Sequence, residues 1–264
     1  MKIDLSGKTV IVMGSSAGIG WGCARGLAVA GATVILCGRQ VEKLSAARDR
    51  LLAAVPHAGV RMVVCDVSTA PGCDALVSAE PMCDILVNNL GSWEPKSFFD
   101  LSDEDWERSF QVNLLPGVRL ARAYLPAMMQ RGWGRVIFLS SEAGLNVPTD
   151  SLHYGVAKTA VLSLSRGLAK LARGSGVTVN AVLPGVTMTE WVGVMVRGLA
   201  EQRGQGFEEA GVAAVKARYP TSIDQRIHTV EEVADLVVYA CSMQASATTG
   251  SALRADGGIV ESIV

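Results

Sequence analysis

The sequence predicts an α/β fold in which a doubly wound parallel sheet is flanked by helices on both faces. Short apolar runs alternate along the chain with longer stretches of helical spacing, which is the order of such a sheet. The runs are apolar almost throughout, as expected for strands that are buried on both faces. A chain of 264 residues can form one such unit, and we expect residues 1–264 to be a single domain.

The first half of the chain follows this alternation. The apolar runs predict strands at residues 8–13, 33–37, 60–65 and 84–87, and the spacing predicts helices at residues 19–30, 41–55 and 71–79. Gly31 is placed to end the first helix, because glycine readily adopts the left-handed conformation found there. Ser102-x-x-Asp105 resembles a capping box, and we expect it to open one long helix that reaches about Gln130.

The second half continues the alternation with one interruption. Strands are expected at residues 135–139, 177–183 and 251–255, and helices at 152–172 and from the capping box Thr229-x-x-Glu232 to about Cys241. Residues 184–228 interrupt the order, since they are rich in glycine and contain only helix-like pieces. A connection of this length is usually a lid or a binding loop, so we expect residues 184–228 to bind substrate.

The composition argues against several classes of function. The formal net charge of the chain is −1, so its charge gives no reason to expect binding to nucleic acid or to an anionic membrane surface. The N-terminus lacks the apolar core of a signal peptide, and no apolar run approaches ~20 residues, so no membrane span is expected. The six cysteines lack metal-ligand spacing, so we predict no metal site and reduced, mostly buried thiols in a cytoplasmic protein.

A glycine-rich turn joins the first predicted strand to the first predicted helix. It reads Gly14-Ser15-Ser16-Ala17-Gly18-Ile19-Gly20. Glycine allows a left-handed backbone and a close approach by a ligand, and the free N–H groups of a helix N-terminus suit a pyrophosphate. The spacing differs from the G-x-G-x-x-G fingerprint, so a plain turn is the alternative. The position at the start of a doubly wound sheet favours phosphate binding.

The end of the second predicted strand bears on the choice of cofactor. A carboxylate there would bind the ribose hydroxyls of NAD and repel a 2′-phosphate, but the strand ends Cys37-Gly38-Arg39. The planar guanidinium of Arg39 can pair with a phosphate. We therefore expect NADP(H) to be preferred, with NAD(H) possible; an exposed surface arginine is the alternative.

Tyr154 and Lys158 lie four residues apart in a predicted helix and so share one face. A phenol titrates near ~10, and a nearby cation lowers its pKa. Tyr154 would then suit general acid/base chemistry at a carbonyl or an alcohol. Ser141 would donate a hydrogen bond to the substrate oxygen if its strand ends beside this helix. Alone, such a pair is more often a solvated helix face.

Together these motifs resemble those of the classical short-chain dehydrogenase/reductase family, including bacterial members similar to 3-oxoacyl-[acyl-carrier-protein] reductases. The motifs stand in the family's order and spacing: Gly14-x-x-x-Gly18-x-Gly20, Asn88-Asn89-Leu90-Gly91, Asn113, Ser141, Tyr154-x-x-x-Lys158 and Pro184-Gly185. The resemblance covers essentially the whole chain. It implies a single Rossmann-like domain with seven parallel strands, and hydride transfer between a nicotinamide and a carbonyl or alcohol carbon.

The resemblance also implies roles for individual residues. Tyr154 would be the acid/base, Ser141 would steady the substrate oxygen, and Asn113 would hold a water in a proton relay. Lys158 would hold the nicotinamide ribose and lower the pKa of Tyr154. The other residues expected at the cofactor are Gly14, Ser15, Ser16, Gly18, Ile19 and Gly20 in the turn, Asp66 and Val67 near the adenine, Asn89 and Gly91 near the adenosine ribose, and Pro184, Gly185 and either Thr187 or Thr189 near the carboxamide.

The substrate side is less defined. The candidate pocket residues are Trp93, Glu142, Asn146, His153, Trp191 and Met195. Trp93 either rims the cleft or simply packs, and Glu142 either charges the pocket or lies on an outer surface. His153 points about 100° around the helix from Tyr154, and a partly exposed surface position is favoured for it.

Three functions remain in competition. The first is an NADP(H)-dependent oxidoreductase acting on a small-molecule ketone or secondary alcohol. The second is the narrower 3-oxoacyl thioester reductase. The third is a catalytically silent nucleotide-binding regulatory protein, which has little need of the complete catalytic set. The resemblance further implies a homotetramer, or a homodimer, in which the helices at residues 102–130 and 152–172 pair across a two-fold axis.

Overall fold

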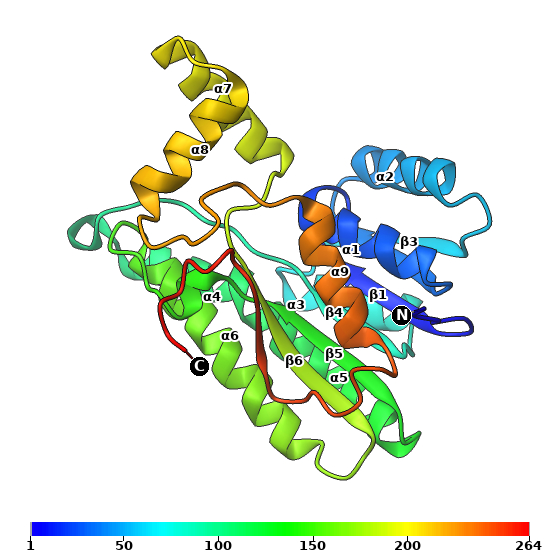
Figure 1. Cartoon of the computed structure of the whole chain (residues 1–264). Helices are drawn as coiled ribbons and strands as arrows, with labels where there is room; N and C mark the ends of the chain where they lie inside the picture. Colours follow the sequence, from blue (N-terminus) through cyan, green and yellow to red (C-terminus); the bar gives the residue numbers. More distant parts are fainter. Residues whose placement is uncertain (1, 264) are drawn as a thin grey trace.

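The computed structural model describes residues 2–263, and within them seven strands form one parallel sheet (Figure 1). The strands are β1 (Thr9–Met13), β2 (Thr33–Gly38), β3 (Val60–Val64), β4 (Ile85–Asn88), β5 (Gly134–Leu139), β6 (Val177–Pro184) and β7 (Ala252–Ala255). Their order is β3-β2-β1-β4-β5-β6-β7, so the direction of winding reverses between β1 and β4. In open α/β sheets, ligands bind at the carboxyl ends of the strands beside this reversal. The predicted fold class and strand number are confirmed.

Helices cover both faces of the sheet (Figure 1). One face carries α1 (Gly18–Val29), α2 (Val41–Ala54) and α9 (Val230–Cys241), and the other carries α3 (Ala70–Ala79), α5 (Leu115–Gln130) and α6 (Leu152–Leu171). Residues alternate between the two cores along each strand. Val10 and Val12 of β1 pack with Leu27 of α1, whereas Ile11 and Met13 pack with Leu120 of α5. The strands are therefore apolar throughout because each side chain meets a helix layer.

The expectation of one long helix from residue 102 to about residue 130 is wrong. The chain forms α4 (Asp103–Asn113) and α5, which are separated at Leu114. Pro116 lacks the N–H that would bond the carbonyl of Val112, and its ring crowds that carbonyl, so the ladder of hydrogen bonds cannot continue. The capping boxes predicted before α4 and α9 are both confirmed.

The region between residues 184 and 228 is more regular than a loop. It contains α7 (Glu190–Arg203) and α8 (Phe207–Arg218), which pack on each other through Val192, Val196 and Ala210. Gly204 ends α7 in the left-handed conformation, with φ of 61°. The two helices stand away from the sheet at the top of Figure 1, above the carboxyl ends of the strands.

The cysteines are free and buried, as predicted, and a cytoplasmic location stays a prediction. Within residues 2–263, no helix is both long enough and apolar enough to cross a bilayer.

Candidate active site

The residues singled out in the sequence gather at the carboxyl edge of the sheet. Gly14 follows β1, Asn89 follows β4, Ser141 follows β5 and Gly185 follows β6. Parallel strands end at the same edge, so segments far apart in the sequence become neighbours there.

The glycine turn is tightly built and leaves its helix N-terminus open. Gly14 and Gly18 have φ of 62° and 54°, in the left-handed region that favours glycine. A Cβ on Gly20 would lie 2.3 Å from the Gly14 carbonyl oxygen, so only glycine fits there. Ala17 precedes α1 without a side-chain cap, which leaves N–H groups of the first turn free for an anion. Asn89 Nδ2 donates to the Gly14 oxygen at 3.2 Å, so this side chain holds the turn itself.

The end of β2 lies beside this turn. Cys37 N donates to Ser15 Oγ at 2.8 Å, which ties the turn to β2. Arg39 is exposed. Arg50 of α2 donates to the Ser16 carbonyl oxygen at 3.0 Å and stacks on the Trp21 ring. The Arg50 guanidinium therefore borders the turn. The sequence did not suggest Arg50, because no spacing pattern marks it.

Asp66 and Val67 follow β3 at the outer part of this edge. Asp66 Oδ1 accepts hydrogen bonds from the hydroxyl and the N–H of Ser68, and these bonds lower the pKa of Asp66. Val67 is buried in the core.

Lys158, Asn113 and Gly91 meet at one point. A Cβ on Gly91 would lie 3.1 Å from Lys158 Nζ and 3.3 Å from Asn113 Oδ1. Asn113 is the last residue of α4, and its Oδ1 accepts from the N–H of Ser92 at 3.0 Å. Lys158 is buried, its Nζ donates to the Leu139 carbonyl at 3.0 Å, and burial lowers its pKa to about 8.

Tyr154 departs from one expectation. The Lys158 ammonium lies 5.6 Å from the centroid of its ring, but the pKa of Tyr154 is raised rather than lowered. The largest cause of the rise is desolvation of the Tyr154 hydroxyl, although the residue as a whole is only partly buried. The nearby Glu142 carboxylate raises the pKa further, and a hydrogen bond with Ser141 lowers it. The pKa of Tyr154 is therefore not lowered in this arrangement, because burial and the Glu142 carboxylate raise it. A lowering by Lys158 stays a prediction.

Ser141 and Glu142 form a buried hydrogen-bonded pair. Ser141 Oγ donates to Glu142 Oε2, and Tyr219 donates its hydroxyl hydrogen to Glu142 Oε1 at 3.1 Å. Burial raises the pKa of Glu142, and these hydrogen bonds oppose the rise. Of the two open readings of Glu142, the structure therefore favours a position inside the site.

Ser141, Glu142 and Tyr154 line a cavity of about 230 Å³. Its wall includes Trp93 and Trp191, whose rings meet edge to face with centroids 5.6 Å apart. The wall of the cavity also includes Met195, Thr187, Arg218 and Tyr219. Arg218 makes a bidentate pair with Asp150, at 2.6 and 3.0 Å, and lies near the Trp93 ring.

The comparisons with known proteins agree with this geometry. Residues 14–260 match a family model described as enoyl-(acyl carrier protein) reductase. The chain is 45% identical over 263 residues to the uncharacterised oxidoreductase YvaG of Bacillus subtilis (strain 168), with all of both chains covered. It is 32% identical to the 3-oxoacyl-[acyl-carrier-protein] reductase FabG of Aquifex aeolicus (strain VF5), over 98% of this chain and 100% of FabG. The crystal structure of L-sorbose reductase from Gluconobacter frateurii, complexed with NADPH and L-sorbose, matches with a TM-score of 0.92 and 30% identity, with 100% of both chains covered.

The chain belongs to the short-chain dehydrogenase/reductase family. It is an NAD(P)-dependent oxidoreductase of carbonyl or CH–OH groups, so the predicted family and enzyme class are confirmed.

The residues present fit a nicotinamide dinucleotide. The uncapped start of α1 leaves N–H groups of its first turn free, and these suit a pyrophosphate. Gly91 keeps the space beside Lys158 Nζ clear of a side chain. In this short-chain dehydrogenase/reductase, a bound nicotinamide supplies or accepts the hydride.

Two threonines left undecided by the sequence lie in different places. Thr189 caps α7 and sits against the glycine turn, with its Cγ2 3.2 Å from where a Gly18 Cβ would be. Thr187 lines the cavity and donates to the Gly185 carbonyl at 3.0 Å.

His153 and Asn146 do not reach the cavity. His153 neither lines the cavity nor lies on the surface, so both expectations for it are wrong. It is buried against Trp106 of α4, with ring centroids 6.3 Å apart, because its position on α6 faces α4. Asn146 is exposed beyond the 3₁₀ turn η2 (Glu142–Gly144). Arg218 and Tyr219, which the sequence did not suggest, come from the end of α8.

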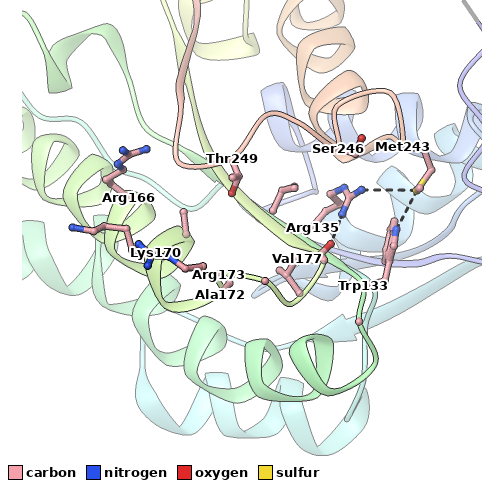
Figure 2. A pocket seen from close by; sticks show the side chains of 15 residues that line it. Trp133, Arg135, Arg166, Lys170, Ala172, Arg173, Val177, Met243, Ser246 and Thr249 are labelled. Carbon is pink, nitrogen blue, oxygen red and sulfur yellow. Dashed lines mark hydrogen bonds between the residues drawn. The ribbon is translucent and has the colours of Figure 1, made fainter.

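Another cavity, of about 580 Å³, lies at the opposite edge of the sheet, where β5 and β6 begin (Figure 2). Among the lining residues that the structure describes, the charged ones are all basic: Arg135, Arg166, Lys170 and Arg173. Arg135 is 1% exposed and donates to the carbonyls of Gly134 and Gly176. This cavity shares no lining residue with the candidate active site of the short-chain dehydrogenase/reductase.

Proposed function

We propose that this enzyme is an NADP(H)-dependent reductase or dehydrogenase of a small ketone or secondary alcohol, with Tyr154 as general acid/base. The observation that carries the proposal is the meeting of Ser141 and Tyr154 in one cavity of about 230 Å³. Lys158 Nζ lies 5.6 Å from the centroid of the Tyr154 ring, and Lys158 and Asn113 lie beside Gly91.

The proposed division of labour follows from these positions. Ser141 holds the substrate oxygen, and Tyr154 donates a proton to that oxygen in reduction or removes it in oxidation. A raised pKa keeps Tyr154 protonated at neutral pH, as an acid must be. Lys158 and Asn113 hold the nicotinamide ribose and a water, through which Tyr154 regains its proton.

Arg39 and Arg50 support a preference for NADP(H) over NAD(H). The Arg50 guanidinium borders the glycine turn, Arg39 directly follows β2, and no carboxylate ends β2. A guanidinium pairs with a 2′-phosphate through two parallel hydrogen bonds. We further propose that the turn residues Gly14 to Gly20, together with Asp66, Val67, Asn89, Gly91, Pro184, Gly185, Thr187 and Thr189, form the remainder of the cofactor site.

The cavity wall favours a compact polar substrate. Two indole rings, one carboxyl group and one guanidinium face a small volume, which suits a ketone that carries further hydroxyl groups. We propose that residues 184–228 are the substrate-binding wall of the same single domain, since Trp191, Met195 and Tyr219 all come from this region.

A 3-oxoacyl thioester reductase is the second candidate, favoured by the 32% identity to FabG of Aquifex aeolicus. A large rate advantage for acetoacetyl thioesters over simple ketones would establish it. A catalytically silent regulator would instead bind the cofactor tightly and turn over nothing.

We also propose self-association as a homotetramer, with a homodimer as the smaller possibility. An apolar hollow of about 620 Å³ lies between α5 and α6, lined by Leu164, Leu168 and Leu171, and Leu171 is 65% exposed. Leu125 on α5 also lines this hollow, although it is only 3% exposed, whereas Leu120 is buried within the subunit and does not line it. A monomer in light scattering at micromolar concentration would contradict the proposal.

Absorbance assays test the proposed function. NADPH and NADH are each offered with a panel of ketones, polyhydroxy ketones, diketones, quinones and acetoacetyl thioesters. We expect faster turnover with NADPH and its loss in Tyr154→Phe. Full turnover in Tyr154→Phe would refute the role of the tyrosine, and equal or better use of NADH would refute the cofactor preference.

A further inference from the structure

Glu142 is a buried carboxyl group that the proposed chemistry leaves unused. It lies directly after Ser141 in η2, is 8% exposed, and lines the cavity. Its two oxygens are bonded to the Ser141 and Tyr219 hydroxyl groups. Among residues 2–263, no cation forms an ion pair with it. A carboxylate without a cation in such a place is costly to keep ionised.

The hydrogen bond from Tyr219 decides where a proton on Glu142 would sit. The Tyr219 oxygen accepts from Arg218 Nε at 3.4 Å, and its own hydrogen is donated to Glu142 Oε1 at 3.1 Å. A proton on Oε1 would weaken this hydrogen bond, whereas a proton on Oε2 can be donated to the Ser141 oxygen. A proton bound to the carboxyl group sits on Oε2, the oxygen that faces Ser141.

The Ser141 hydroxyl has one hydrogen to donate and two lone pairs to offer. The N–H of Ala143 uses one lone pair, at 3.2 Å. When Glu142 is ionised, the single hydrogen goes to Oε2, and none is left for a substrate oxygen or for the hydrogen bond with Tyr154. When Glu142 is protonated, Oε2 donates to the second lone pair, and the Ser141 hydrogen becomes free to point into the cavity.

We propose that Glu142 is protonated in the active enzyme and acts as a positioning residue that directs the Ser141 hydrogen toward the substrate oxygen. This inference rests on the proposed function of Ser141 and Tyr154. Reduction and oxidation share one transition state, so ionisation of Glu142 slows both directions. No bond of the substrate is made or broken by Glu142.

The surroundings of Glu142 favour its protonated form. Burial raises its pKa, while hydrogen bonds from Ser141 and Tyr219 act in the opposite direction. The titratable groups that face it are Tyr154 and Lys158 of α6 and Tyr219 after α8, and a charge on Glu142 raises the pKa of all three. Arg218 is the nearby guanidinium, and it is paired with Asp150.

Glu142→Gln tests the proposal, because its amide group donates to Ser141 and accepts from Tyr219 without titrating. We expect wild-type turnover to fall as rising pH ionises Glu142, and this fall to be absent in Glu142→Gln. Tyr219→Phe removes a donor that favours the carboxylate, so it should move the midpoint of the fall upward by about one to two pH units. In a Ser141→Ala background, Glu142→Gln should leave the pH profile unchanged.

An infrared titration of the substrate-free protein gives a readout that does not depend on turnover. We expect a protonated-carboxyl band, absent from Glu142→Gln, that disappears at the pH where wild-type turnover falls. A missing band at every pH, or the same pH profile in wild type and Glu142→Gln, would overturn the proposal. Activity retained in Tyr154→Phe would instead refute the proposed function while leaving the band in place, so the two failures can be told apart.

Discussion

Gly20→Ala is the sharpest test of the glycine turn. The added Cβ would lie 2.3 Å from the Gly14 carbonyl oxygen and 2.4 Å from Asn89 Nδ2, about an ångström short of ordinary contact at 3.4 Å. Gly14 is held in a left-handed turn with φ of 62°, and Asn89 Nδ2 is bonded to it, so neither neighbour can yield freely. The helix must move away from the turn.

The cost of this movement follows from the same distances. Overpacking of this kind costs about 1–3 kcal/mol, and the better helix propensity of alanine returns up to about 1 kcal/mol. With the full gain of alanine, we therefore expect a net loss of about 0–2 kcal/mol in the free energy of unfolding. Because the movement displaces the N–H groups proposed to bind the pyrophosphate, NADPH affinity should fall by at least about tenfold.

Urea unfolding and a fluorescence titration with NADPH measure the two effects. Gly167→Ala is the matched control: Gly167 lies in α6, and a Cβ there meets nothing within 4 Å. This control should be stabilised by about 1 kcal/mol and should bind NADPH as wild type does. If Gly20→Ala behaves like Gly167→Ala in both assays, the reasoning about the turn is wrong.

Three further changes probe other parts of the molecule. Arg39→Ala should weaken NADPH binding by about tenfold and leave NADH binding unchanged, and an equal loss for both would argue against the NADP(H) preference. Ser102→Ala removes the acceptor for the N–H of Asp105 and should lower the free energy of unfolding by about 1 kcal/mol in urea; no change would show that the capping box is unimportant. The third change is Lys158→Met. Burial lowers the pKa of Lys158 from 10.5 to about 8, so between these pH values the unfolded chain binds a proton that the native chain has released. The free energy of unfolding of wild type therefore rises with pH in this window. Across this window the unfolding free energy of wild type should therefore rise by about 3 kcal/mol relative to that of Lys158→Met, and parallel pH curves would refute the shift.

Much of the fold was predictable because its signals are local. A strand buried on both faces needs an unbroken apolar run, and a capping box needs two side chains three residues apart. The break before α5 also has a local signal, which is Pro116. The prediction of one long helix was wrong because the apolar spacing on both sides of Pro116 fits a single helix. The shared face of Tyr154 and Lys158 follows from helix geometry alone.

The sequence by itself therefore determined the order of the elements, the glycine turn and the family to which the chain belongs. Only the tertiary structure decided the electrostatics and the wall of the cavity. Tyr219 bonds to Glu142 across 77 positions of the sequence, His153 turns to α4, and the pKa of Tyr154 rises instead of falling. Periodicity reports which face of an element a residue occupies, whereas desolvation and pairing depend on distances in space that no local pattern encodes.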